Sequence, residues 1–323
     1  MKKLLMNNIA RLLLVFFAFL SFTFLQAQQE QHNVHNMFNQ LSYNPGFAGS
    51  VNGICATGLI RQQWVGFEGA PATYNINIHS PLSVVHGGIG ASIYQDELGY
   101  QKEIGVKLMY AYRHDLGMGN LGVGVQVGFI NGSVDFSQFE VGKNVRDGGD
   151  YIIEGKQEVS DMLLDFGLGV QYFVPEKFYV GISSTRLSEQ ESPDDLLAYK
   201  SRRHYYLNAG YMWALPGNPS FVLEPSILVK SDGTKTEYDL AGLLKYNNKF
   251  WGGVSFSANS TLQVKDPLAV LVGIAIKDVK IGYAYTVPTS QIGSGGSHEV
   301  MVGYCFKINF DKGRRSYKNT RFL

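Results

Sequence analysis

Apolar and polar residues alternate along almost the whole chain after residue 50. In the stretch Tyr74–His79, for example, every second residue is apolar and the residues between are Asn or His. The same alternation runs through Leu121–Phe129 and through Val300–Phe310. Successive side chains of a β-strand point to opposite faces, so a period of two predicts strands with one apolar and one polar face. No amphipathic helix competes in the middle of the chain, and the pattern predicts an all-β protein.

About 14 such segments follow one another, and the gaps between them indicate how they are connected. The segments begin near Gly53, Thr73, His86, Lys102, Leu121, Asp161, Lys177, Arg202, Ser220, Thr236, Phe250, Pro267, Val279 and His298. Longer gaps, such as 95–101 and 135–160, alternate with short ones, such as 247–249 and 277–278. Short turns at one end and long loops at the other are typical of outer-membrane barrels, whose short turns face the periplasm. The sequence therefore predicts a transmembrane antiparallel β-barrel over residues 53–310, with both termini periplasmic.

The first 27 residues have the features of a secretory signal peptide. Lys2, Lys3 and Arg11 precede an uncharged, Leu- and Phe-rich run from Leu12 to Leu25. This run is shorter than the roughly 20 residues that a membrane-spanning helix needs, and it ends in Leu-Gln-Ala before a Gln-rich stretch. We therefore expect cleavage after Ala27. No cysteine lies near this junction, which argues against a lipid-anchored N-terminus.

Composition and charge narrow the class of protein further. The chain has 28 Lys and Arg against 27 Asp and Glu, and loss of the signal peptide would leave it slightly acidic. Nothing in this balance indicates nucleic-acid binding. The counts of 37 Gly, 19 Tyr and 20 Phe against only 10 Pro favour β structure in contact with outer-membrane lipid. A soluble secreted β-sandwich would also alternate, but it would not explain the alternating loop lengths.

An unusual stretch leads into the first predicted strand. Asn44–Ser50 reads Asn-Pro-Gly-Phe-Ala-Gly-Ser, and it is followed by Arg61-Gln62-Gln63-Trp64 and by Gly69-Ala70-Pro71-Ala72-Thr73-Tyr74-Asn75. Together with Ser80-Pro81-Leu82 and the final Tyr317–Leu323, these motifs resemble the PorP/SprF family. The resemblance runs from about Met37 to the C-terminus. Gly46-Phe47 stands where the family more usually has Ala-Tyr, which leaves the predicted barrel unchanged.

The resemblance implies a function that periodicity alone would not reveal. It implies a component of the type IX secretion system of Bacteroidetes, in the cell outer membrane, whose partners are subunits of a periplasmic ring and secreted cargo proteins with C-terminal sorting signals, such as gliding adhesins. We therefore expect a non-enzymatic adaptor or gate that links the ring to the cargo. A barrel of this size can also hold an open lumen. A passive outer-membrane diffusion porin is therefore the alternative.

Two parts of the motif stretch are candidate partner-binding residues. Residues 28–52 are expected to form a periplasmic N-terminal segment at the barrel entrance, with Asn44, Pro45 and Gly49 in a rigid turn at or inside the periplasmic mouth. The same turn could serve only to start the first strand. Arg61 should face the lumen, where it could pair with an acid and hold a plug or loop in place. Trp64 is either a partner contact or an aromatic residue at the membrane interface.

The C-terminal tail, residues 311–323, is predicted to be a basic periplasmic segment. Its cations include Arg314, Arg315, Lys318 and Arg321, against a single acid, Asp311. Such a tail could dock on an acidic surface of the ring. The alternative is a solvated tail without a partner.

No arrangement of residues indicates catalysis, a cofactor or a metal. Gly117-Met118-Gly119-Asn120-Leu121-Gly122 matches a dinucleotide-binding pattern, but a predicted strand follows it where a phosphate site needs a helix. The histidines are scattered without metal-ligand spacing or a nucleophile elbow. We therefore predict a protein that is not an enzyme, with no metal and no cofactor.

The two cysteines lie on strands that a closed barrel would bring together. Cys55 is early in the first predicted strand and Cys305 is late in the last, and by alternation both point into the lumen. The periplasm can be oxidising. The sequence therefore leads to the hypothesis of a disulfide across the closure seam.

Overall fold

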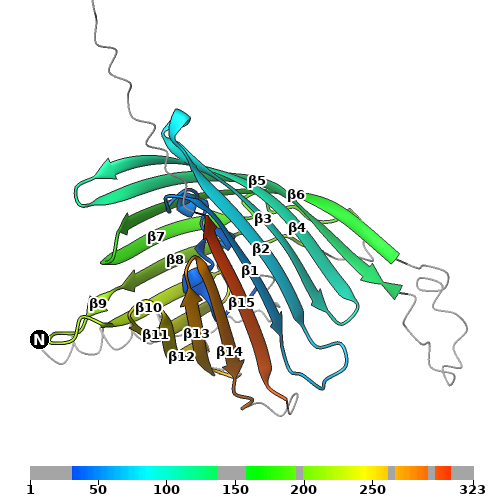
Figure 1. The fold of residues 1–323 in the computed structure, drawn as a ribbon. Helices are drawn as coiled ribbons and strands as arrows, with labels where there is room; N and C mark the ends of the chain where they lie inside the picture. The colour runs from blue at the N-terminus through cyan, green and yellow to red at the C-terminus, as the bar shows by residue number, and fades with distance from the viewer. Residues whose placement is uncertain (1–30, 137–157, 194–198, 261–265, 290–294, 307–323) are drawn as a thin grey trace, which may run out of the picture.

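The chain folds into a closed antiparallel barrel in the computed structural model, which describes residues 31–136, 158–193, 199–260, 266–289 and 295–306. Fifteen strand segments are described: β1 Ile54–Gln62, β2 Ala72–Leu82, β3 Gly87–Leu98, β4 Gln101–Leu116, β5 Gly119–Asp135, β6 Glu158–Val174, β7 Phe178–Thr185, β8 His204–Tyr211, β9 Trp213–Ala214, β10 Phe221–Ser231, β11 Thr236–Tyr246, β12 Phe250–Asn259, β13 Leu268–Ile276, β14 Val279–Thr286 and β15 Ser297–Phe306. Segments β8 and β9 pair with the same neighbour, β10, and act as one strand interrupted at Met212. The wall therefore has 14 strands in sequence order (Figure 1).

The barrel closes because β1 pairs with β15. Ile54 lies opposite Phe306 and Gln62 lies opposite His298, so the first and last strands form a full antiparallel ladder. Closure pairs the two strands that would otherwise be the free edges of the sheet, as β structure inside a membrane requires. The predicted fold class, an all-β barrel of about 14 strands, is confirmed. Among the described residues, no helix has the length and apolar character needed to cross a membrane.

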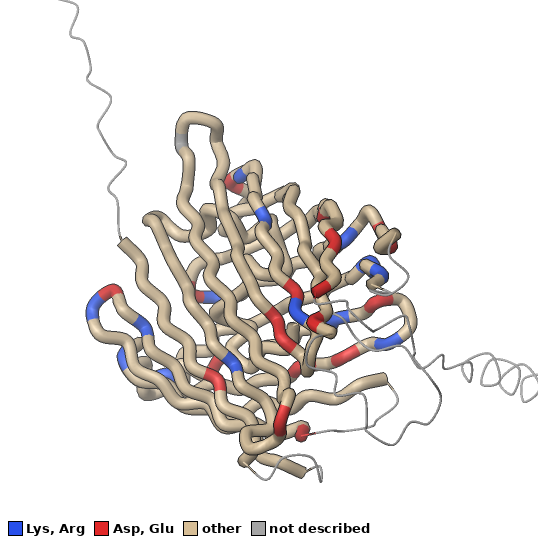
Figure 2. The backbone as a smooth tube through the Cα atoms, turned by 90° about the vertical axis from the view of Figure 1, so that its right-hand side faces the viewer, with Lys and Arg blue, Asp and Glu red and all other residues tan. Residues whose placement is uncertain are grey.

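The alternation read from the sequence sorts the side chains between the two faces of the wall. In β2, Ile76 and Ile78 are exposed on the outside, whereas Asn75 and Asn77 are buried in the lumen. Figure 2 shows long stretches of the wall without Lys, Arg, Asp or Glu. An apolar outer face and a polar inner face are the pattern of a lipid-embedded barrel.

The connections are mostly short at one end of the barrel and long at the other, as predicted. We call the end with residues 117–118, 175–177, 247–249 and 277–278 the turn end, and the opposite end the loop end. One gap departs from the prediction. We expected a longer loop over 95–101, but the β3–β4 ladder continues to Leu98 and Gln101 and leaves only Gly99 and Tyr100 between the strands. Gly99 has a φ of 59°, which a glycine adopts without strain and which permits this tight turn.

Residues 31–50 fill the middle of the lumen, and we call this segment the plug. Figure 1 shows it in blue inside the ring of strands. It contains three short 3₁₀ helices, η1 Asn36–Phe38, η2 Gln40–Ser42 and η3 Pro45–Phe47. His32 lies near the loop end, beside Lys230 of β10, whereas Gly49 lies near the turn end, against Gly88 of β3. The plug therefore runs along the lumen toward the turn end, where the chain enters β1.

The position of the plug refines one prediction about the N-terminal part of the chain. Residues 28–52 were predicted as a periplasmic segment at the entrance, and the described part of that range lies within the lumen, starting near the loop end. The predicted signal peptide, residues 1–27, and the N-terminus itself lie outside the described residues. Strand β1 begins at the turn end, and strand β15 ends there.

Candidate functional site: a plugged lumen

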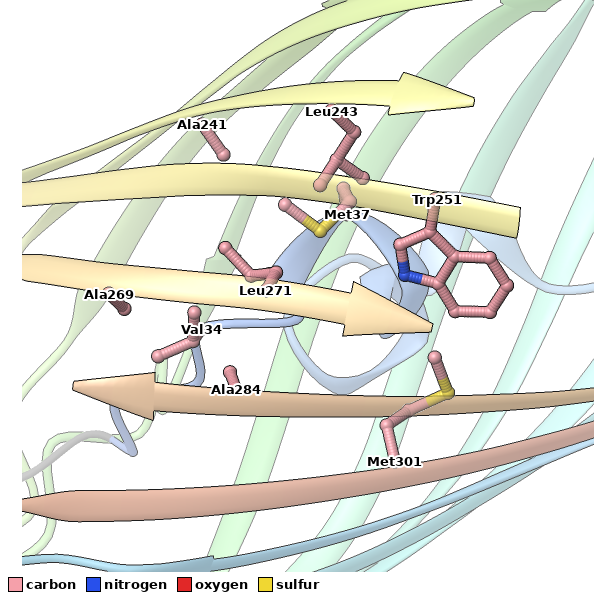
Figure 3. Close-up of a cluster of buried hydrophobic side chains, with 9 residues drawn as sticks. All are labelled: Val34, Met37, Ala241, Leu243, Trp251, Ala269, Leu271, Ala284 and Met301. Carbon is pink, nitrogen blue, oxygen red and sulfur yellow. The ribbon is translucent and has the colours of Figure 1, made fainter. Parts of the chain in front are cut away.

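The plug has two halves that face different walls. The first half, residues 31–38, packs against β10–β15 and the adjacent end of β1, and the second half, residues 39–50, packs mainly against β2–β8. Figure 3 shows Val34 and Met37 of the first half among seven side chains of the wall. Different interactions hold the two halves in place.

A buried carboxylate on β15 holds the first half. Glu299 accepts hydrogen bonds from the backbone N–H of Val34 at 2.8 Å, the backbone N–H of His35 at 2.7 Å, and His35 Nδ1 at 2.7 Å. Arg61 Nη1 on β1 donates at 3.3 Å to Glu299 Oε2, the oxygen that also accepts from Val34. Glu299 and His35 are fully buried and Arg61 nearly so. We call these residues the Glu299 cluster. A buried carboxylate is stable when it is both hydrogen-bonded and paired, as it is here.

A second group of charges meets the plug at His32. Lys230 of β10 lies 3.1 Å from Glu237 and 3.4 Å from Asp239, both on β11, and 3.3 Å from His32 Nδ1. Burial lowers the pKa of His32, so the imidazole is neutral near pH 7 and Nδ1 accepts a hydrogen bond from Lys230. The first described turn of the plug is thus bound by charged groups of the wall.

Apolar packing completes the first half. Val34 and Met37 pack with Ala241, Leu243, Trp251, Ala269, Leu271, Ala284 and Met301. The Phe38 ring lies 5.4 Å from the Trp251 ring. The ammonium groups of Lys245 and Lys280 both lie over the Phe38 ring. Three of the wall residues, Ala241, Ala269 and Ala284, have short side chains, which leave room for the plug.

Amide side chains bind the start of the second half. Asn39 donates to Asn75 at 3.1 Å and also bonds to Asn77. Gln40 accepts from Gln171 of β6 at 3.2 Å. These amides bond to one another without any charge, and they fix η2 against β2 and β6.

Asn44 is the most connected residue of the predicted turn. Its side chain accepts from the Gly46 N–H at 2.9 Å, which caps η3, and donates to Gln171 Oε1 at 2.9 Å and to the Val170 carbonyl at 3.2 Å. Pro45 occupies the first position of η3, where a missing N–H costs nothing. These bonds make the turn rigid. It lies inside the lumen, which is one of the two locations predicted for it.

Glycines of the wall let the backbone of the second half approach closely. A Cβ added at Gly124 of β5 would collide with the Pro45 carbonyl group, and one at Gly88 of β3 would collide with Ala48 and Gly49. Gly49 itself has a φ of 68°, which few other residues adopt. Its predicted role in a turn has this structural basis. The second half is thus seated by backbone contact, which a single added methyl group would disrupt.

Cavities remain on both sides of the plug. The cavity toward the loop end, of about 220 Å³, is lined by His32, Arg61, Trp64, Glu237 and Asp266, among others. The structure thus brings Arg61 and Trp64 to one cavity, as neighbours of the plug. Trp64 Nε1 donates to Asp266 at 2.8 Å, so this residue is tied to the β12–β13 connection. The cavity toward the turn end, of about 150 Å³, lies between the plug and the β1–β15 seam.

Other buried charges line the lumen on the β4–β7 wall. Lys107 lies 3.7 Å from Asp165, which also accepts from Gln126 at 3.0 Å and from the Arg186 N–H at 2.8 Å. Arg186 pairs with Glu103 at 2.5 Å. Sequence reasoning did not single out these residues, nor Glu299, His35 or Lys230. For those on strands, the signal is an ionisable side chain at a lumen-facing position of the alternating pattern; His35, on the plug, and Arg186, after β7, have no such signal.

The two cysteines meet at the seam. Cys55 and Cys305 lie directly opposite each other on β1 and β15 and form a disulfide, with their Cα atoms 4.0 Å apart. Both line the cavity on the turn side of the plug. The tail residues Arg314, Arg315, Lys318 and Arg321 lie outside the described residues. Within the described ranges, no group of three His, Cys, Asp or Glu side chains could hold a metal ion.

Comparison with known proteins gives one family and several barrels of low similarity. The model of a family described as type IX secretion system membrane protein PorP/SprF matches residues 25–304. No curated protein matches the sequence. The chain is similar to the outer membrane protein Omp33 of Acinetobacter baumannii, with 10% identity, a TM-score of 0.43, and coverage of 80% of this chain and 100% of that chain. It is also similar to the toluene transporter TbuX of Ralstonia pickettii, with 11% identity, a TM-score of 0.49, and coverage of 86% and 94%.

Proposed function

The chain belongs to the PorP/SprF family of type IX secretion system membrane proteins, and we propose that it acts in that system as an adaptor with a gated lumen. It is a β-barrel of the outer membrane. In the proposed role it links subunits of the periplasmic ring to secreted cargo proteins with C-terminal sorting signals. Chemistry on a substrate forms no part of this role, which matches a family of membrane secretion components.

One observation carries the proposal: the lumen is occupied by the chain's own N-terminal segment. The plug contacts the wall through buried hydrogen bonds on β15, β2 and β6 and through close backbone contacts on β3 and β5. A passive porin needs a continuous aqueous path. A barrel closed by a segment with its own dedicated partners is better suited to binding other proteins at its two mouths.

The proposed contact with the ring lies at the turn end and in the basic tail. Strand β15 ends at the turn end, at Phe306. If the turn end faces the periplasm, as short turns do in outer-membrane barrels, the cations Arg314, Arg315, Lys318 and Arg321 are within reach of an acidic surface of the ring. Trp64 and Arg61 lie toward the opposite mouth, so any partner they contact acts from the loop side.

Crosslinking in native outer membranes would test the adaptor function. An affinity tag placed between Asp135 and Glu158 would recover the crosslinked barrel, and mass spectrometry would identify what is attached to it. We expect ring subunits or secreted cargo, and we expect to lose them when residues 316–323 are deleted. A matched variant with Arg314, Arg315, Lys318 and Arg321 replaced by Gln keeps the length of the tail and tests its charge.

The result that would contradict the adaptor function is recovery of the barrel alone. Single-channel recording would then examine the alternative, because a diffusion porin conducts continuously in a planar bilayer whereas a plugged barrel does not.

A further inference from the structure

The plug joins the wall of the barrel at the turn end. Ser50 is followed within four residues by Ile54, the first residue of β1. At the other end of the described plug, near the loop end, the His32 side chain contacts Lys230 and Asp239 of the wall. Release of these contacts and of the Glu299 cluster would free the first half from the wall without a change in the strands themselves.

The contacts of the first half are concentrated on one group. Both backbone N–H groups and the imidazole that anchor Val34 and His35 donate to the same carboxylate, that of Glu299. In the second half, by contrast, hydrogen bonds are spread over Asn75, Gln171 and Val170, on β2 and β6. Loss of a single group could therefore free the first half but not the second.

The first half also keeps polar atoms that the wall does not satisfy. Gln31 Nε2, Asn33 Oδ1 and His35 Nε2 are buried without a hydrogen-bond partner among the described residues. In the second half only Ser50 Oγ is in this condition. His35 Nε2 faces the bare backbone of Gly282, where an added Cβ would lie 2.7 Å away. Unsatisfied buried polar atoms lower the free-energy cost of exposing the first half to water.

The wall meets the first half through side chains. Three of the seven wall side chains around Val34 and Met37 are alanines, Ala241, Ala269 and Ala284 (Figure 3). Among the described residues, no wall glycine lies against the backbone of this half, and Gly282 lies against the His35 ring alone. The loop-side cavity meets this half at His32 and the Glu299 cluster at Arg61, so the cluster can be reached from the loop end.

We infer that the first half of the plug is a releasable latch held by Glu299, that the second half is its fixed anchor, and that release opens a passage along β10–β15. This inference deepens the gate part of the proposed function. It requires only the barrel and its plug, so it can fail while the adaptor function holds, and the reverse is also true.

Conductance of the purified full-length protein in planar bilayers tests the latch. Glu299→Gln keeps the shape of the side chain but removes the charge that attracts the three plug donors and Arg61. We expect the fraction of time spent open to rise by about tenfold or more over the unmodified protein, because removal of one partner of a buried charged network is strongly destabilising. Asp165→Asn is the matched control. It neutralises another buried lumenal carboxylate with its own lysine partner, Lys107, and its bonds run to Lys107, Gln126 and Arg186 of the wall side.

Two buried positions report which half moves. Met37 is 6% exposed in the first half and Leu41 is 2% exposed in the second. Each is replaced by Cys in turn, with and without Glu299→Gln, and labelled with a water-soluble maleimide. We expect Met37→Cys to react only in the Glu299→Gln background and Leu41→Cys to stay protected in both. The inference is overturned by equal opening in Asp165→Asn, by labelling of Leu41→Cys together with Met37→Cys, or by a Glu299→Gln protein that remains closed and unlabelled.

Discussion

The two halves of the plug occupy the same lumen but are stabilised by opposite means. The first half depends on charge in addition to its apolar packing: one carboxylate, Glu299, accepts three of its hydrogen bonds, and Lys230 bonds to His32. The second half depends on shape: glycines of β3 and β5 admit the backbone of Ala48, Gly49 and Pro45. Removing one member of a buried charged pair removes the whole interaction. A substitution in a closely packed region removes only the contacts of the substituted residue. The first half of the plug can therefore be released as a unit, and the second half cannot.

The largest expected effect comes from removing Arg61. Arg61→Met leaves the Glu299 carboxylate buried without its cation, and we expect the free energy of unfolding to fall by about 4 kcal/mol. Adding Glu299→Gln to the same chain should restore part of the loss, because the uncompensated charge is gone. Urea titration in lipid vesicles measures both. Equal and additive losses from the two substitutions would show that the first half is not held by charge.

A slightly smaller effect is expected from removing the disulfide that joins β1 and β15 at the seam. Cys55→Ser with Cys305→Ser should lower the free energy of unfolding by about 3 kcal/mol, because the crosslink restricts the unfolded chain. Maleimide should label no thiol in the denatured, unreduced protein and two thiols after reduction. Labelling of both cysteines before reduction would mean that the disulfide does not form.

The shape of the second half is tested by one methyl group. Gly124→Ala places a Cβ against the Pro45 carbonyl, and we expect a loss of about 2 kcal/mol from this overpacking. Gly242→Ala is the control, since no atom lies within 4 Å of a Cβ at that position on β11. Thermal unfolding in detergent compares the two variants. If both behave alike, the close approach of plug and wall does not contribute to stability.

The smallest expected effect is a dependence on pH at the start of the first half. Burial lowers the pKa of His32 below its ordinary value of 6.5, with Asp239 and Glu237 opposing and Lys230 and Arg61 adding to this shift. Because the seated form binds a proton less readily than the released form, its stability is full above pH 6.5 and declines as the pH falls below it, by at most about 1.4 kcal/mol per pH unit. His32→Gln should remove this dependence, measured as open time against pH. An unchanged pH profile in this variant would assign the effect to another group.

The wall of the barrel was predictable because its rule is local. Strand starts predicted from the period of two lie within three residues of those in the structure, since lipid outside and polar groups inside impose the alternation at every step. The same rule predicted that Arg61 faces the lumen. It failed at 95–101, where ladder hydrogen bonds extend through polar residues that carry no apolar signal.

The plug was less predictable because its partners are far away along the chain. Local chemistry alone indicated that Asn44, Pro45 and Gly49 form a rigid turn. Nothing local indicated that His35 meets Glu299, which lies 264 residues later. No periodic pattern runs through residues 31–50, so the sequence did not indicate that they fill the lumen.

By itself, the sequence determined an outer-membrane barrel, its strand order and the faces of its strands, because each of these follows from how one residue meets lipid or water. Only the tertiary structure decided that residues 31–50 lie in the lumen, which carboxylate holds them, and which glycines admit them. These depend on the distances between strands brought together by closure, and a linear pattern contains no such distances.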